Sequence, residues 1–118
     1  MDWKLTDGRP VWLQLKEHIT MGIITGTYPP GSRLPSVREL AMDAGVNPNT
    51  MQRALMELER DGLAYSKGTL GRLVTEDRSR IEDLRKEAAQ GVMARYLEGM
   101  KQLGYSAAEA VKVLEEWK

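Results

Sequence analysis

Cysteine is absent from this 118-residue chain, and histidine occurs only once. Without cysteine there can be no disulfide, no thiolate metal site and no cysteine nucleophile. The single histidine, His18, lies beside Glu17 on the expected polar side of a helix. No second histidine is present to complete a catalytic or metal-binding cluster. We therefore expect a surface histidine and a protein that is not an enzyme and uses neither a cofactor nor a metal.

Long apolar runs are also missing, since no stretch of 18 consecutive apolar residues occurs, and a membrane-spanning helix is not expected. The first ten residues, MDWKLTDGRP, lack the charged and then apolar layout of a signal peptide. Hydrophobic residues make up 42% of the chain and charged residues 29%, as in ordinary globular proteins. The composition predicts a soluble cytoplasmic protein of one domain, or one small domain with an extension.

An excess of positive charge is the third absence. The chain has 17 basic and 17 acidic residues, whereas nucleic-acid binders usually carry a basic excess. Within residues 33–53 and 65–74, however, bases outnumber acids: Arg33, Arg38, Arg53, Lys67 and Arg72 against Glu39 and Asp43. The sequence therefore allows a locally basic surface on a neutral protein.

The first predicted helix covers about residues 10–25. Pro10 suits its first turn and Gly26 its end. The proline-rich stretch YPPGSRLP follows, and we expect it to be a loop. Trp3 and Trp12 are expected to anchor the N-terminal arm. The apolar stripe of this helix recurs at helical spacing: Trp12, Leu15, Ile19 and Ile23.

Two further helices are predicted to meet across a tight turn. The first begins at Ser36, which has capping-box spacing to Glu39, and it ends at Gly45. Asn47 caps the second. A glycine-containing turn of three to four residues between two helices is typical of a helix-turn-helix. The buried stripe of the second helix comprises Met51, Ala54, Leu55 and Leu58.

Two short extended runs follow, at residues 63–66 and 72–75, with Gly68 and Gly71 between them. This pattern predicts a β-hairpin. Three helices and a hairpin in this order indicate a winged helix-turn-helix. The expected fold is therefore mainly α with a small β-hairpin, and we place this domain at residues 1–76.

Residues 77–118 differ in character, because charges alternate and apolar residues step by four and three, the heptad rhythm of a helix–helix seam. We expect a two-helix region whose apolar faces need a partner, either the first domain or a second chain. A small effector pocket lined by Met93, Tyr96 and Met100 is an alternative, but a packed dimer seam is favoured. The expected dimer residues are Leu84, Ala89, Met93, Tyr96, Met100, Leu103, Val113, Leu114 and Trp117.

The outward face of the third helix begins with amide, hydroxyl and guanidinium groups, from Asn49, Thr50, Gln52 and Arg53. Asparagine and glutamine can bond bidentately to adenine, and arginine to guanine. A recognition helix enters the major groove with its N-terminal end, where free amides also face phosphate. A capped surface helix can carry such residues without a function. Together with the preceding helix and the hairpin, they favour binding to double-stranded DNA.

The stretch PPGSRLPSVRELAMDAGVNPNTMQRALMELERDGL resembles the GntR family of bacterial transcription regulators. In that family the loop reads PG-x-x-LPS, followed by REL and a valine-led turn into the recognition helix. VNPNT with ELERDGL is similar to the short-tailed YtrA subfamily, and the resemblance spans roughly residues 12–75. A two-helix tail of this length is what YtrA-like members use for dimerisation.

The resemblance also implies a DNA-binding site, in which Ser36 and Arg38 contact the phosphate backbone. Many family members have arginine where Pro48 and Gln52 stand, so base preference does not carry over. The wing usually ends Gly-Thr-Phe, whereas here Arg72 follows Gly71, as either an added phosphate contact or a solvated strand residue. The implied groove residues are Asn47, Asn49, Thr50, Gln52 and Arg53, and the implied wing residues are Lys67, Gly68, Thr69, Gly71 and Arg72.

The sequence thus predicts a homodimeric repressor that binds a pseudo-palindromic operator, and the resemblance suggests ABC-transporter genes as targets. The alternative is a winged-helix module that binds proteins, which zero net charge would suit. A further variant keeps DNA binding and adds a small-molecule effector of unknown identity in the dimer seam. No membrane partner is expected.

Overall fold

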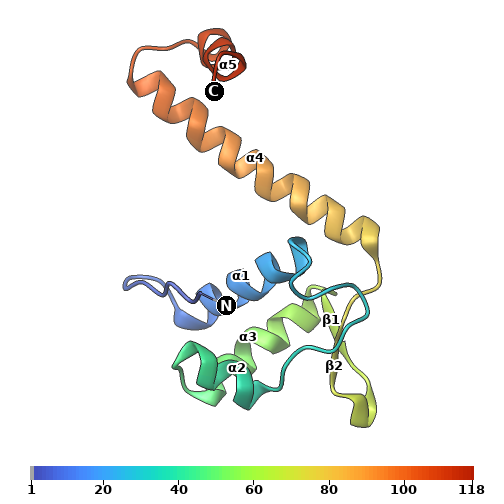
Figure 1. Ribbon diagram of the computed structural model, residues 1–118. Helices are drawn as coiled ribbons and strands as arrows, with labels where there is room; N and C mark the ends of the chain where they lie inside the picture. The colour runs from blue at the N-terminus through green and yellow to red at the C-terminus, as the bar shows by residue number, and fades with distance from the viewer. Residues whose placement is uncertain (1) are drawn as a thin grey trace. The chain divides into compact units, whose positions relative to one another are not determined.

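The computed structural model describes residues 2–118 (Figure 1). In chain order the elements are α1 (Val11–Ile24), α2 (Val37–Ala44), α3 (Pro48–Arg60), β1 (Ala64–Ser66), the 3₁₀ turn η1 (Gly68–Leu70), β2 (Arg72–Val74), α4 (Arg78–Gln102) and α5 (Ala107–Glu115). The prediction of a mainly α fold with a small hairpin is confirmed. No helix among the described residues is long and apolar enough to cross a bilayer.

The chain divides into two compact units, one ending at Glu82 and the other running from Asp83 to Lys118. The division falls within α4, after its first turn. The expected functional boundary after residue 76 stays a prediction. Each unit is described separately below.

The core of the first unit is built around α3, which packs against α1, α2 and β1. Both predicted apolar stripes lie in this core, although Trp12 at the start of α1 is only half-buried. Leu63 and Val74 cover the core from the hairpin side. Helix α3 is therefore fixed from several directions, and its outward side is left for other contacts. The side chains that form the stripes and are almost wholly buried are Leu15, Ile19, Ile23, Met51, Ala54, Leu55 and Leu58.

Local interactions fix the start of α2 and the turn between α2 and α3, as predicted. The Glu39 N–H donates to Ser36 Oγ over 3.1 Å, and the Ser36 N–H donates to Glu39 Oε1 over 3.3 Å. Gly45 ends α2 with a φ of 70°, a left-handed conformation that favours glycine. The Asn49 N–H donates to Asn47 Oδ1 over 2.7 Å and caps α3.

The stretch YPPGSRLP is more than the loop that was predicted, because part of it pairs with β2. Arg33 forms an antiparallel bridge with Leu73. The Leu34 N–H donates to the Arg72 carbonyl over 2.9 Å, and the Val74 N–H donates to the Ser32 carbonyl over 2.8 Å. The prolines keep this segment from becoming a regular strand, but the residues between them still cover the outer edge of the hairpin.

In the second unit, a hydrogen bond fastens α5 to α4: the Tyr96 hydroxyl donates to the carbonyl of Ala110, a fully buried residue, over 2.8 Å. Ser106 and Glu109 form the predicted capping box at the start of α5. The hydrogen bonds from the Ser106 N–H and then from its side chain lower the pKa of the exposed Glu109 carboxyl. The turn between the two helices is therefore locally determined.

Candidate nucleic-acid interface

The first turns of α3 present most of the predicted groove residues to solvent. Asn47, Asn49, Gln52 and Arg53 are exposed, and Thr50 is half-buried. The side-chain oxygen of Asn47 is used for the cap, so this residue keeps only its amide N–H groups for an outside acceptor. Asn49 and Gln52 keep both donor and acceptor groups available, as reading a base edge requires.

The Arg53 guanidinium lies over the indole ring of Trp12, with its carbon 4.3 Å from the ring centroid. This is a cation–π contact between α3 and the first turn of α1. Trp12 was expected to be a packing anchor only. Sequence spacing could not reveal the contact, because 41 positions separate the two residues along the chain.

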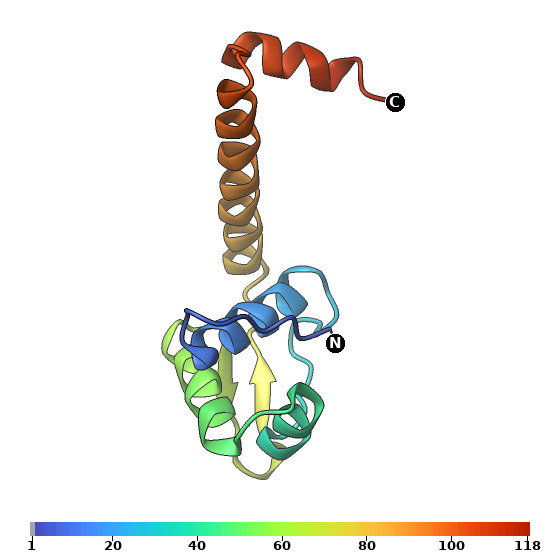
Figure 2. The same cartoon turned by 90° about the vertical axis from the view of Figure 1, so that its left-hand side faces the viewer.

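Ser36 caps the start of α2 and Arg38 lies in its first turn, and both side chains are exposed. The Ser36 oxygen accepts the Glu39 N–H, but its hydroxyl hydrogen remains able to donate. Figures 1 and 2 show α2, the start of α3 and the tip of the hairpin on the same, lower side of the first unit. The structure thus brings the α2, α3 and wing residues to one side.

The tip of the wing is formed by η1, where Lys67, Gly68 and Thr69 are exposed. Gly71 has a φ of 83°, and a Cβ added there would lie 3.5 Å from Arg33 Nε. Arg33 is exposed and was not among the predicted site residues. Its charge was visible in the sequence, but only the pairing of residues 32–34 with β2 places it on the wing.

Arg72 is held inside the protein. Its side chain is 16% exposed, and its Nε lies 3.3 Å from Glu59 Oε1, within ion-pair distance but not aligned for a hydrogen bond. The Ser66 hydroxyl donates to the same carboxylate oxygen. The interpretation of Arg72 as a solvated strand residue is therefore wrong. Because the Arg72 Nε faces Glu59, a phosphate contact from this residue would have to come from the terminal nitrogens of its guanidinium.

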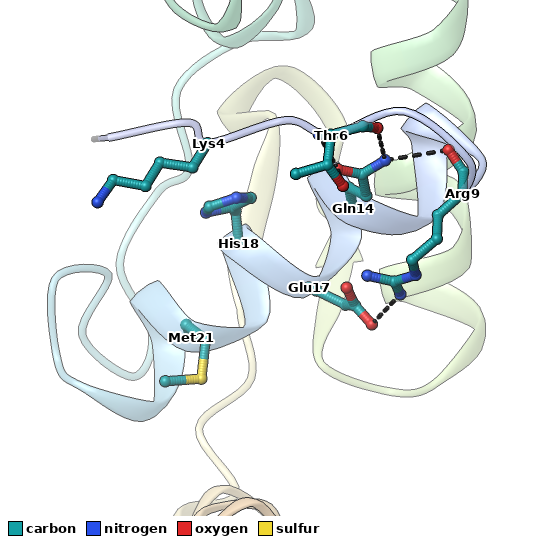
Figure 3. A pocket seen from close by; sticks show the side chains of 7 residues that line it. All are labelled: Lys4, Thr6, Arg9, Gln14, Glu17, His18 and Met21. Carbon is teal, nitrogen blue, oxygen red and sulfur yellow. Dashed lines mark hydrogen bonds and ion pairs between the residues drawn. The ribbon is translucent and has the colours of Figure 1, made fainter.

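The N-terminal arm and α1 enclose a shallow cavity of about 310 Å³ (Figure 3). Gln14, only 4% exposed, closes its floor. The Gln14 amide oxygen accepts the Thr6 N–H over 2.7 Å, and its amide nitrogen donates to the carbonyls of Thr6 and Arg9. Arg9 pairs with Glu17 at 2.7 Å, which raises the arginine pKa. These polar groups bind one another and hold the arm.

Trp3 anchors the same arm, as expected. Its indole N–H donates to Asp43 Oδ2 over 2.7 Å, which ties the arm to α2. Its ring lies 5.4 Å from the ring of His18. His18 is half-buried and lines the cavity, so the expected surface histidine is partly covered by its surroundings. Within residues 2–118 no cluster of three or more metal-binding side chains occurs.

The second unit carries many exposed apolar side chains on α4 and α5, which together we call the tail surface. Among the predicted dimer residues, Met93 is 55% exposed, Leu103 74% and Trp117 80%. Exposed apolar patches of this kind mark interaction sites. Leu84, Tyr96 and Met100 are half-buried, and Tyr96 has a partner in its own chain. The tail surface comprises the predicted residues Ala89, Met93, Leu103, Val113, Leu114 and Trp117, together with Val92, Leu97 and Val111, which were not predicted.

Comparison with known proteins adds three similarities. Residues 12–74 match the family model described as "Bacterial regulatory proteins, gntR family". The chain is 32% identical to the HTH-type transcriptional repressor YtrA of Bacillus subtilis, over 92% of this chain and 81% of that protein. A GntR family transcriptional regulator from Listeria monocytogenes has a similar structure, with a TM-score of 0.84, 35% identity, and coverage of 97% of this chain and 100% of that one.

The first unit is also similar to a structure with bound DNA. The DNA-binding domain of AraR, solved in complex with operator ORX1, has a TM-score of 0.55 and 30% identity. The match covers 64% of this chain and 92% of that domain.

Proposed function

The chain belongs to the GntR family of bacterial transcription regulators, and we propose that it is a homodimeric repressor that binds a pseudo-palindromic operator in the cytoplasm. It is a regulator and not an enzyme. The observation that carries the proposal is the outward side of α3, where Asn49, Gln52 and Arg53 are exposed at the capped N-terminal end of the helix. These are the side chains that read base edges in the major groove.

Contacts to the DNA backbone would come from both sides of α3. Ser36 and Arg38 on α2 supply a hydroxyl and a guanidinium, and Lys67 and Thr69 at the wing tip supply an ammonium and a hydroxyl. Such contacts fix the register of a protein on the duplex without reading sequence. They would also allow DNA binding by a chain with no net charge, because basic residues outnumber acidic ones, five to two, within residues 33–53 and 65–74, which carry these contacts.

Dimerisation would use the tail surface, since two copies can cover each other's exposed apolar side chains. Two recognition helices related by a two-fold axis would then meet half-sites about 10 bp apart, or a multiple of that. Repression is supported by the name of the relative YtrA. The resemblance to that subfamily extends the proposal to ABC-transporter genes.

Selection of bound fragments from genomic and random DNA tests the proposal directly. We expect enrichment of a two-fold symmetric sequence that lies over promoters, and reduced transcription from a reporter that carries it. Absence of any enriched sequence would contradict the proposal. It would favour the alternative of a protein-interaction module, which zero net charge suits.

Arg38→Ala is expected to weaken binding to every duplex. Loss of one phosphate contact should reduce the slope of log affinity against log salt by about 1. Gel shifts across a salt series measure this slope. Lys86→Ala, which removes an exposed charge from α4, is the control and should leave the slope unchanged. An unchanged slope for Arg38→Ala would remove this residue from the interface.

Gln52→Ala is expected to reduce operator affinity by about 1–3 kcal/mol and affinity for random DNA by less, because an amide that bonds a base edge discriminates between sequences. The measurement is competition between operator and random duplexes. Gln102→Ala removes an exposed amide from α4 and should change neither affinity. Equal losses on both duplexes for Gln52→Ala would show that Gln52 does not read a base.

A further inference from the structure

Arg53 is the exposed groove residue of α3 whose side chain contacts another helix: its guanidinium group lies against Trp12 of α1. Its guanidinium carbon lies 4.3 Å from the centroid of the Trp12 ring. Trp12 is half-buried in the first turn of α1, and α1 packs closely on α3. The ring is therefore held by the fold, while the arginine that lies on it remains exposed.

The contact uses the flat face of the guanidinium and leaves its edges free. A cation–π contact involves the face, whereas the five N–H donors of arginine point outward in its plane. Within residues 2–118 this guanidinium makes no hydrogen bond or ion pair that would occupy those donors. Its donors thus remain available to an acceptor outside the protein.

From this geometry we propose that Trp12 is a positioning residue for DNA recognition, which holds Arg53 in the orientation that its in-plane donors need to reach acceptors on the duplex. The inference rests on the proposed function. Arginine has one of the largest side-chain entropies to lose on ordering. Ordering it before binding reduces that loss and so raises affinity. Asn49 and Gln52 have shorter side chains, for which such support matters less.

The test is a double-mutant cycle on a duplex selected by the wild-type protein, with a random duplex of equal length for comparison. Trp12→Leu should lower affinity for the selected duplex about two- to fivefold, as loss of an exposed cation–π contact predicts. In an Arg53→Ala background, Trp12→Leu should cause no further loss. Trp12→Tyr keeps an aromatic face and should restore most of the affinity. Val11→Ala, an exposed neighbour on α1, is the matched control and should have no effect.

A second variant avoids the half-buried tryptophan altogether. Arg53→Lys keeps the charge but loses the planar group that stacks and presents several donors. It should lower affinity for the selected duplex while leaving the salt slope unchanged. The role of Trp12 would be overturned if Trp12→Leu lowered affinity equally in the wild-type and the Arg53→Ala backgrounds. It would also be overturned if Arg53→Lys bound the selected duplex as the wild type does. Either result would leave the proposed function intact. A wild-type protein that selects no sequence would overturn both.

Discussion

Leu55→Ala is expected to lower the free energy of unfolding of the first unit by about 2–5 kcal/mol. Leu55 is 1% exposed and lies on the inner side of α3, in the core that this helix shares with α1 and α2. Removing its methyl groups leaves a cavity that closely packed neighbours can fill only in part. Because Gln52 and Arg53 lie on the same helix, operator binding should weaken as the unit unfolds.

Chemical denaturation followed by circular dichroism measures this loss. Met56→Ala, at the next position on α3, is the control, because Met56 is 55% exposed and substitutions at such sites usually change stability by less than about 0.5 kcal/mol. Equal destabilisation by the two variants would mean that α3 does not pack through the side that contains Leu55.

Met93→Glu is expected to raise the dissociation constant of the proposed homodimer by roughly 100-fold or more, because burying a carboxylate without a partner costs several kcal/mol. Met93 is 55% exposed in the single chain, so the folded monomer should tolerate the change. Operator affinity should also fall in this variant, because a monomer has one recognition helix and two linked recognition helices bind far better than one. Sedimentation at a series of concentrations and gel shifts on the same samples measure both effects.

Gln90→Glu adds the same charge to α4 at an exposed position outside the predicted seam, and it should leave the dimer intact. If Met93→Glu and the wild type associate equally, the tail surface serves another partner. If Met93→Glu lowers the helix signal in circular dichroism, the substitution unfolds the second unit, and Met93 then belongs to the core of that unit.

The elements that sequence reasoning predicted best are those controlled by neighbouring residues. The starts of α2 and α5 follow from Ser36 and Ser106, whose hydroxyl oxygens accept the backbone N–H groups of the residues three positions later. The turn before α3 follows from Gly45, which adopts the left-handed backbone. The buried stripe of α3 follows from helical periodicity alone.

The features that the sequence did not reveal depend on contacts between residues far apart in the chain. For Arg72 the sequence left a phosphate contact and a solvated strand residue as alternatives, and only the folded chain places its Nε 3.3 Å from Glu59 Oε1 of α3. Tyr96 fits a dimer seam by spacing, yet its hydroxyl binds Ala110 in the same chain. Periodicity identifies the apolar side of a helix but not what covers it.

By itself, the sequence determined approximately where the helices and the hairpin begin and end and which sides of α1 and α3 are buried, since caps, glycines and apolar spacing act over a few residues. It also determined the family, because that pattern is carried by a continuous stretch of the chain. Only the tertiary structure decided the surroundings of the charged side chains. Arg53 lies on Trp12, Arg72 pairs with Glu59, and Arg33 reaches the wing. The physical reason is that a charged group takes its partner from whatever the packing of the elements brings near, at any distance along the chain.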